Sequence, residues 1–338
     1  MEKFEVVIIG AGPSGLRAAK ILTGAGREVI VLEKNSTIGQ KVCAGGVFPK
    51  IFQLGIPEYL IESKFNSIKI HLPWHKIEIK SQDFLLATID REKLGKFLAE
   101  EAERAGAKIC LNSEVKSIEK DKVILKNNQE IYFDYLIGAD GGLSLVRRYL
   151  KLPLKFTFTL QYTLSRSFEN LEVFYDPKLF GTGYAWIFPH KNWTKIGCGA
   201  DLKFHTGNQL RENFHSWLKK MKINYEGAKL EGAIINYDYQ GYQFGKIFLV
   251  GEAAGFVSGL SGAGIYQALI SGEEITKKIL NPKYRPKITS MLISQKIQEK
   301  ILDVMELNQN LTLFFQEILN LGLYLKINFF NLFNKFFP

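Results

Sequence analysis

Cysteine is scarce in this sequence: the 338 residues include three, Cys43, Cys110 and Cys198. An odd number of widely spaced cysteines argues against a disulfide framework and is typical of a reducing compartment. No two cysteines have the spacing of a metal-binding pair, and the five histidines do not cluster. The sequence therefore predicts neither a structural nor a catalytic metal.

Long apolar runs, low-complexity tracts and internal repeats are also missing. The apolar run at residues 4–9 is short and β-branched, and a glycine loop follows it at once, with no small-residue cleavage site. These features predict a buried strand and not a signal peptide. We therefore expect a cytoplasmic protein.

Acidic residues are outnumbered, 34 against 44 Lys and Arg, which gives a net charge of +10. This balance suits nucleic acid, an anionic membrane or a phosphorylated substrate, and equally a basic surface that only keeps the protein soluble. The basic residues form no arm or stripe, and no nucleic-acid-binding module is recognisable. We expect no nucleic-acid partner.

What the sequence does contain is a glycine-rich turn after the strand at residues 4–9. Gly10 permits the tight turn, Gly12 lets the backbone approach a pyrophosphate, and Gly15 lets helix and strand pack together. The helix N-terminus then offers free N–H groups to the phosphates, and Glu33, after a second strand, can accept hydrogen bonds from ribose hydroxyls. The turn therefore predicts a site for FAD or NAD and disfavours NADP. The residues expected at the cofactor here are Gly10, Gly12, Pro13, Ser14, Gly15, Glu33 and Lys34.

Two later segments, LIGADGGLSLVR at residues 136–147 and the glycine- and alanine-rich residues 248–275, each have a buried strand followed by a small-residue loop. Both resemble flavin motifs of the para-hydroxybenzoate hydroxylase superfamily of FAD-dependent oxidoreductases. The resemblance implies FAD as the cofactor. It extends to Arg91, which matches a family arginine at the start of a helix beside the cofactor. The cofactor-binding residues that it implies are Arg91, Asp140, Gly141, Gly251, Glu252, Gly262, Ala263, Gly264 and Ile265.

The third motif departs from the family at one position, because Glu252 stands where an aspartate is usual. Glutamate is one methylene longer and still accepts hydrogen bonds, so we expect the ribityl contact to be kept with a shift or through water. Residues 253–255 are expected to start a helix whose dipole faces the phosphates.

Two more motifs, KVCAGGV at residues 41–47 and YAWIFPHKNWTKIGCG at residues 184–199, together resemble the geranylgeranyl reductase family. These flavoenzymes saturate isolated double bonds of isoprenoid chains. The resemblance implies that the first motif lies at the flavin and that the second lines a lipid pocket. The residues implied at the flavin are Lys41, Cys43, Ala44 and Gly45. Those implied at the substrate are Tyr184, Trp186, Phe188, Pro189, Gly197 and Gly199.

The aromatic residues of the second motif also have a physical reading. Tyr184, Trp186 and Phe188 alternate along the chain, so on a strand they share one face and form an apolar wall. Gly197 and Gly199 leave space for another backbone or a ring to approach. Aromatic residues alone would equally fit a sheet face that is buried against a helix.

Cys43 is a candidate catalytic residue. An isolated alkene is not polarised, so the carbon that does not receive hydride needs a proton, which a thiol or a water held by it can supply. The small neighbours of Cys43 would let the thiol stand close to the flavin. The alternative is a small buried filler, which is common for cysteine.

The segment 311–338 holds seven phenylalanines, interrupted by Gln, Glu, Asn and Lys too often to span a bilayer. It fits an interfacial helix, with Lys326 and Lys335 towards an anionic surface, and it equally fits a lid packed over the substrate domain. Either role would suit a lipid substrate.

The expected fold is α/β: a doubly wound, Rossmann-like FAD-binding domain, an antiparallel-sheet substrate domain and C-terminal helices. The expected FAD-binding domain spans residues 1–62, 90–150 and 238–280, the substrate domain residues 63–89 and 151–237, and the C-terminal helical segment residues 281–338.

The function expected from the resemblance is an FAD-dependent reductase of isoprenoid chains on a lipid, quinone or diphosphate. The electron donor stays open between NAD(P)H, ferredoxin and another reductant, because no second dinucleotide site is visible. A flavin monooxygenase that hydroxylates an aromatic or apolar compound is the alternative, since the superfamily motifs serve both. Peripheral contact with the cytoplasmic face of a membrane is a further expectation.

Overall fold

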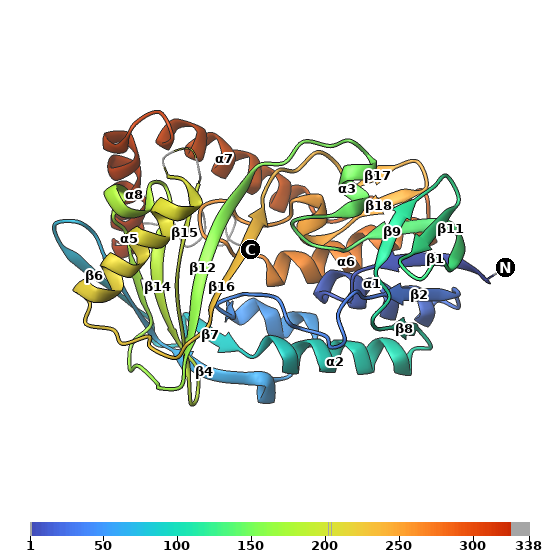
Figure 1. The fold of residues 1–338 in the computed structure, drawn as a ribbon, viewed down its shortest axis with the longest axis horizontal. Coiled ribbons are helices and arrows are strands. Elements are labelled where there is room, and N and C mark those ends of the chain that lie inside the picture. Colours follow the sequence, from blue (N-terminus) through green and yellow to red (C-terminus); the bar gives the residue numbers. More distant parts are fainter. Residues whose placement is uncertain (1, 202, 204, 326–338) are drawn as a thin grey trace.

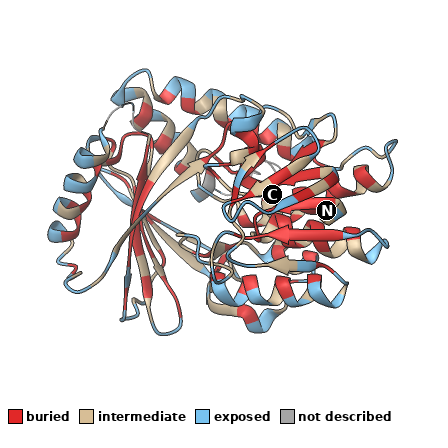
Figure 2. Ribbon diagram, turned by 45° about the vertical axis from the view of Figure 1, so that its right-hand side comes forward, coloured by how far each residue is buried: buried red, intermediate tan, exposed pale blue. Residues whose placement is uncertain are grey.

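The computed structural model describes residues 2–201, 203 and 205–325, and it has two large sheets with helices packed on them. Figure 1 shows the N-terminal sheet on the right and the second sheet on the left, with the C-terminal helices across the top. The centre of the N-terminal sheet is buried, the second sheet has both buried and partly exposed residues, and the helices expose their outer faces (Figure 2). This arrangement confirms the predicted fold class.

The N-terminal sheet has a parallel core. Five parallel strands lie in the order β18-β11-β1-β2-β8, with β17 antiparallel at the edge and the β9–β10 hairpin joined to β11. Every residue of VIVL in β2 is buried, as expected for a β-branched run with both faces covered. The strands are β1 (Glu2–Ile9), β2 (Val29–Leu32), β8 (Lys108–Cys110), β9 (Val115–Ile118), β10 (Lys122–Leu125), β11 (Glu130–Gly138), β17 (Gln243–Phe244) and β18 (Ile247–Leu249).

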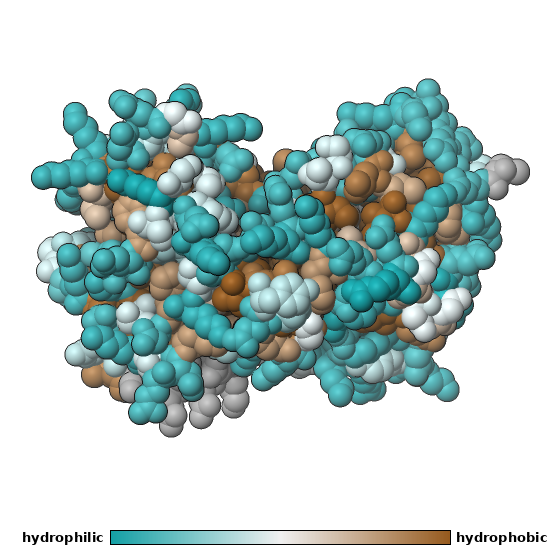
Figure 3. Space-filling view, turned by 90° about the horizontal axis from the view of Figure 1, so that it is seen from below, coloured by the Kyte–Doolittle hydropathy of each residue, from teal (hydrophilic) through white to brown (hydrophobic). Residues whose placement is uncertain are grey.

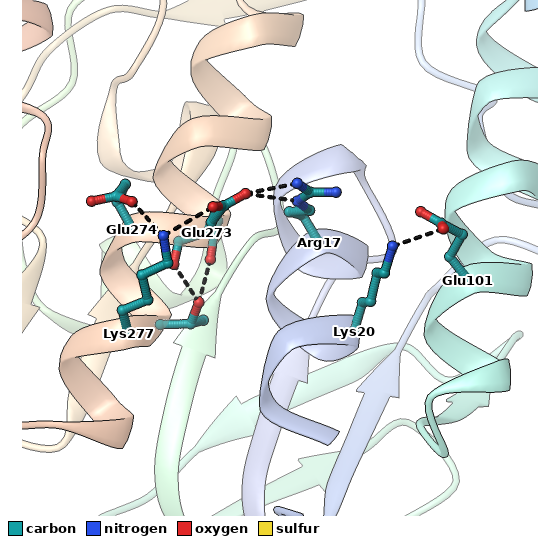
Figure 4. A network of polar contacts seen from close by, with 8 residues as sticks. Arg17, Lys20, Glu101, Glu273, Glu274 and Lys277 are labelled. Carbon is teal, nitrogen blue, oxygen red and sulfur yellow. Dashed lines mark hydrogen bonds and ion pairs between the residues drawn. The ribbon is translucent and has the colours of Figure 1, made fainter. Parts of the chain in front are cut away.

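Helix α1 (Pro13–Gly24) lies between α6 (Ile265–Leu280) and α2 (Arg91–Arg104) (Figure 4). Arg17 donates two hydrogen bonds to Glu273 of α6, at 3.1 and 2.7 Å, and Lys20 donates one to Glu101 of α2 at 2.7 Å. A Cβ at Gly272 would lie 2.4 Å from the carbonyl oxygen of Ser14, so glycine is needed where α6 crosses the start of α1. The helix that carries the glycine turn is therefore held from both sides.

The second sheet has seven strands in the order β16-β12-β15-β14-β13-β5-β6, and all pairs are antiparallel except β13 with β5. One face packs on α5 (Gly207–Lys220), where Ile187, Ile196 and Phe214 belong to one apolar cluster. The strands are β5 (Ser67–His71), β6 (Lys76–Lys80), β12 (Phe156–Leu164), β13 (Glu172–Phe174), β14 (Tyr184–Pro189), β15 (Thr194–Ala200) and β16 (Leu230–Asn236).

A small three-stranded sheet, β3-β7-β4, joins the two halves and was not predicted. The segment 63–89 is thus divided, with β5 and β6 in the large second sheet and β7 outside it. The domain boundaries expected from the sequence stay predictions. The remaining short elements are β3 (Gly46–Val47), β4 (Ile61–Phe65), β7 (Leu86–Ile89), α3 (Leu145–Tyr149), α4 (Pro177–Phe180), and the 3₁₀ helices η1 (Pro49–Leu54), η2 (Glu58–Leu60) and η3 (Gly251–Ala254).

The chain ends in α7 (Thr289–Met305) and α8 (Gln309–Tyr324). Helix α8 packs over the second sheet, where Glu317 lies 3.4 Å from His75. Of the described helices, none is both long and apolar enough to cross a membrane. Lys326 and Lys335 lie outside the described residues.

Candidate functional site

The glycine turn has the shape of a phosphate site. Gly10 has φ +102°, and a Cβ there would lie 2.5 Å from the carbonyl oxygen of Ala139. A Cβ at Gly15 would lie 2.1 Å from the carbonyl oxygen of Gly10, so only glycine lets α1 pack this closely. At Gly12 a Cβ would meet only Ala139 O, at 3.8 Å, which leaves the other side of Gly12 open to a ligand.

The start of α1 leaves its N–H groups available. Pro13 is the first helical residue, and no described side chain caps the helix. By contrast, Asp90 caps α2 by accepting from two backbone N–H groups, at 2.8 and 3.2 Å. Uncapped N–H groups at a helix start attract an anionic group.

Glu33 lies at the end of β2, beside the turn, and is 9% exposed. Its carboxylate accepts hydrogen bonds from the backbone N–H of Ala11 at 2.9 Å and from the side chain of Asn35 at 2.7 Å. These bonds orient the carboxylate and leave lone pairs for ribose hydroxyls. Lys34, next to it, is exposed.

The second motif supplies a buried acid with one free oxygen. Asp140 Oδ2 accepts from the backbone N–H groups of Leu145 and Val146 at 2.6 and 3.3 Å. Oδ1 is buried and has no partner among the described residues. Burial raises the pKa of Asp140, and hydrogen bonds from Ser144 and from backbone N–H groups oppose this rise. An unpaired buried carboxylate oxygen is costly, which fits a group that receives a ligand hydroxyl.

The three cofactor motifs meet. A Cβ at Gly10 would lie 2.9 Å from Cα of Asp140, and one at Gly251 (φ +58°) would lie 2.5 Å from Oγ of Ser14. At Gly141, φ is +77° and no described atom lies within 4 Å of the Cβ position. Segments more than a hundred residues apart thus form one backbone-lined site.

The predicted helix start at residues 253–255 is wrong. Gly251–Ala254 form one 3₁₀ turn that ends at Gly255 in the left-handed region, with φ +83°. The long helix of this motif, α6, begins only at Ile265, after Gly262, Ala263 and Gly264. In the described chain α6 has no side-chain cap and no acidic residue in its first turn, so its N-terminus is a second open helix start beside the site.

Glu252 is turned towards residues 41–47, the cysteine loop, which contains Cys43. Its Oε1 accepts from the backbone N–H of Asn236 at 3.2 Å, and its Oε2 pairs with the ammonium of Lys41. The extra methylene relative to aspartate thus lets the carboxylate reach another segment. The expected contact with the ribityl chain stays a prediction.

The side chain of Lys41 is partly exposed: 39% of it is accessible to solvent. Burial, followed by repulsion from Arg91, nevertheless lowers the pKa of Lys41 to about 8.

Arg91, at the first position of α2, is 8% exposed, and its Nε has no hydrogen-bond partner within the described structure. It is therefore not an ordinary surface cation. Its charge acts on both Cys43 and Lys41. A buried, partly unpaired guanidinium fits the side of a bound anionic cofactor.

Cys43 lies among these cations. Burial alone would raise the pKa of its thiol, and the charge of Arg91 and the N–H of Gly45, 3.4 Å from Sγ, act against burial. The charges of Lys195 and Lys41 add to this effect, so the pKa of Cys43 is lowered. The thiol gives up its proton more easily than an ordinary one.

The aromatic residues predicted at the substrate share one face of the second sheet, opposite α5. Tyr184 Oη donates to the carbonyl oxygen of Ser261 at 2.5 Å, next to the third motif. Burial raises the pKa of Tyr184, with further contributions from Tyr175 and Cys43. A Cβ at Gly46 would lie 2.7 Å from the ring of Phe188. This face therefore meets both the cysteine loop and the loop before α6.

The two glycines of this motif serve the packing of the sheet. A Cβ at Gly197 would lie 2.3 Å from the indole of Trp186, so the space at Gly197 is taken by a ring of the same motif. A Cβ at Gly199 would lie 3.2 Å from Thr159. Their direct contact with substrate stays a prediction, as does that of Pro189, which is buried.

Two residues of the same motif were missed. Lys195 donates a hydrogen bond to the carbonyl oxygen of Cys43 at 2.7 Å. Nε2 of His190 lies 3.0 Å from the carbonyl oxygen of Ala44. Burial lowers the pKa of His190 to about 4, so the ring is neutral at pH 7 and Nε2 is the donor. The alternation Lys195-Gly197-Gly199 already placed the lysine on the aromatic face, and that signal could have found it.

Comparisons with known proteins indicate the class to which this chain belongs. A family model described as FAD binding domain matches residues 3–171. Digeranylgeranylglycerophospholipid reductase 2 of Methanosphaera stadtmanae is 31% identical in an alignment 311 positions long that covers 80% of this chain and 76% of the relative. Geranylgeranyl diphosphate reductase of Rhodobacter capsulatus is 28% identical in an alignment 293 positions long that covers 80% of this chain and 73% of the relative.

Among solved structures, a geranylgeranyl bacteriochlorophyll reductase-like protein from Thermoplasma acidophilum has the same fold. The TM-score is 0.75 at 20% identity, covering 90% of this chain and 92% of that one. The fold and the matched FAD-binding domain define an FAD-dependent oxidoreductase. Within that class, the chain belongs to the geranylgeranyl reductase family.

Proposed function

We propose that this oxidoreductase saturates carbon–carbon double bonds of isoprenoid chains carried by a lipid, a quinone or a diphosphate. The observation that carries the proposal is the position of the cysteine loop, between the cofactor motifs and the aromatic face. Lys195 and His190 hold its carbonyl groups, and the Phe188 ring lies on Gly46. The names of the relatives support the same substrate class.

FAD fits the residues that would hold it. The glycine turn and the open start of α1 would take the pyrophosphate, Glu33 the ribose, and Asp140 a ribityl or ribose hydroxyl. The N-terminus of α6 would face the ring system. When bound, FAD supplies the hydride, and its electrons come from NAD(P)H, ferredoxin or another external donor.

The chain itself supplies position and a proton. The aromatic face holds an apolar chain away from water, and Cys43 transfers its proton to the alkene carbon that does not receive hydride. The C–H bond forms as the S–H bond breaks, and solvent returns a proton to the thiolate. A thiol with a lowered pKa favours this transfer.

The test uses the FAD-loaded protein, reduced with dithionite without oxygen and given geranylgeranyl diphosphate or a prenylated glycerophospholipid. We expect mass spectrometry to show one added hydrogen pair for each saturated bond. In D₂O, each saturated bond should gain deuterium. A product that gains oxygen, with oxygen uptake coupled to it in air, would instead establish the monooxygenase alternative.

We also propose that α8 docks the enzyme on the cytoplasmic face of an anionic membrane. The polarity of this helix is inverted: Thr312, Gln316 and Asn320 are 0, 2 and 3% exposed, whereas Phe314 and Leu321 are 55 and 50% exposed. An apolar outer face on a protein of charge +10 fits an anionic bilayer. On the face shown in Figure 3, hydrophilic side chains predominate and apolar residues form separate patches.

The double variant Phe314→Asp/Leu321→Asp should bind vesicles of phosphatidylglycerol at least about tenfold more weakly, because burial of two large apolar side chains is lost. Cosedimentation measures this. Tyr59→Asp is the control, because Tyr59 is also a large exposed apolar residue, 75% exposed, but lies outside α8. This variant should bind as the wild type does. Equal binding by all three proteins would contradict the docking proposal.

A further inference from the structure

Lys195 is a charged residue on an otherwise uncharged stretch of β15. In the sheet register it lies opposite Thr163 of β12 and Phe188 of β14. The neighbouring positions Ile196 and Cys198 belong to the apolar cluster at α5. Strand alternation therefore directs Lys195 to the face that meets the cofactor half.

The Lys195 ammonium crosses between the two halves of the molecule. It donates to the carbonyl oxygen of Cys43 at 2.7 Å, a contact between residues 152 positions apart. His190 makes the parallel contact to Ala44, but its ring is neutral. Lys195 is thus the residue of the second sheet that brings both a hydrogen bond and a positive charge to the cysteine loop.

The charges around this contact come from several elements. Burial lowers the pKa of Lys195 and Arg91 lowers it further, whereas Cys43, Glu231 of β16 and Asp90 act in the opposite direction. On the side of the thiol, the charged neighbours are Arg91 of α2, Lys41 of the loop itself and Lys195; Tyr184 of β14 senses the same thiol.

We propose that Lys195 is a positioning residue: its hydrogen bond ties the backbone of Cys43 to the second sheet and holds a positive charge beside the thiol. The proposal rests on the proposed function, in which Cys43 gives the proton. Lys195 itself touches neither the alkene nor the transferred proton. Its effect is on how easily Cys43 loses a proton and where that proton is placed.

The test measures the acidity of the thiol directly. The rate at which iodoacetamide alkylates Cys43 in the FAD-loaded enzyme is followed against pH, with the modified peptide identified by mass spectrometry. Loss of a neighbouring positive charge raises a thiol pKa, so Lys195→Met should move the midpoint of the profile up by about 1 pH unit. Lys195→Arg, which keeps the charge, should stay close to the wild type.

The control separates charge from structure. His190→Phe removes the donor to Ala44 and keeps a flat ring against Trp193, on which His190 stacks at 3.6 Å. This variant should leave the midpoint unchanged. An unmoved midpoint in Lys195→Met, or an equal shift in His190→Phe, would overturn the proposal.

The FAD content of each variant shows whether it has folded, and Lys195→Gln replaces Lys195→Met if that protein lacks flavin. The outcome is independent of turnover. If alkylation shifts as expected but Cys43 variants reduce substrate normally, the proposed role of Cys43 fails while the contact of Lys195 stands. If instead the Cys43 variants lose activity but alkylation does not shift in Lys195→Met, only the inference about Lys195 fails.

Discussion

Gly15→Ala should purify without FAD. The added Cβ would lie 2.1 Å from the carbonyl oxygen of Gly10 and 3.0 Å from the Cβ of Ala139. Both neighbours belong to the packed backbone of the cofactor site, so α1 must move away from β1 and the phosphate site is lost. The visible absorbance of flavin relative to protein absorbance measures the effect, with added FAD failing to restore it.

A matched control lies in the same helix. Gly24 ends α1, and no atom of the described chain lies within 4 Å of its Cβ position. Gly24→Ala should keep its full FAD content and its melting temperature. If Gly15→Ala retained flavin as well as Gly24→Ala does, the assignment of this turn to the cofactor would be refuted.

Cys43→Ala should lower the rate of alkene reduction by about 10²-fold or more, the usual contribution of a positioned general acid. FAD should remain bound, because the loop is held through backbone carbonyl groups that the substitution does not remove. Anaerobic stopped-flow measurement of flavin reoxidation by a prenyl substrate isolates this step. Reduction of the flavin by dithionite should proceed at the wild-type rate.

Cys110→Ala serves as the control, since this cysteine packs against the core of the cofactor half. It should reduce substrate at the wild-type rate. Normal steady-state reduction by both Cys43→Ala and Cys43→Ser would dispose of the proton-donor role.

Local patterns sufficed to predict the α/β fold class, whereas the residues assigned to the cofactor stay predictions. Three features can be recognised from residues close together in the sequence: the glycine turn, Glu33 at a strand end and the alternating aromatic residues. Their geometry follows from the periods of strands and helices. The contacts of Lys195 and His190 could not be read in this way. They join residues 152 and 146 positions apart, so they depend on how the two sheets pack.

The error at the third motif and the group that fills the space at Gly197 both depend on contacts between residues far apart in sequence. Residues 251–254 do not continue as a helix because Gly255 turns against Asp238, whose carbonyl oxygen would lie 2.4 Å from a Cβ. The space expected at Gly197 receives the ring of Trp186 from the neighbouring strand. Strand register and chain crossings decide both, and neither follows from residues close in sequence.

The cofactor motifs lie near residues 10–33, 138–147 and 251–265. Most of the polypeptide must therefore leave the ribosome before all three motifs can contact the nucleotide. Binding of FAD is therefore one of the last steps of folding. Because FAD binds the folded state and not the unfolded chain, its binding adds to the stability of the folded protein. A higher concentration of free FAD therefore makes the folded protein more stable.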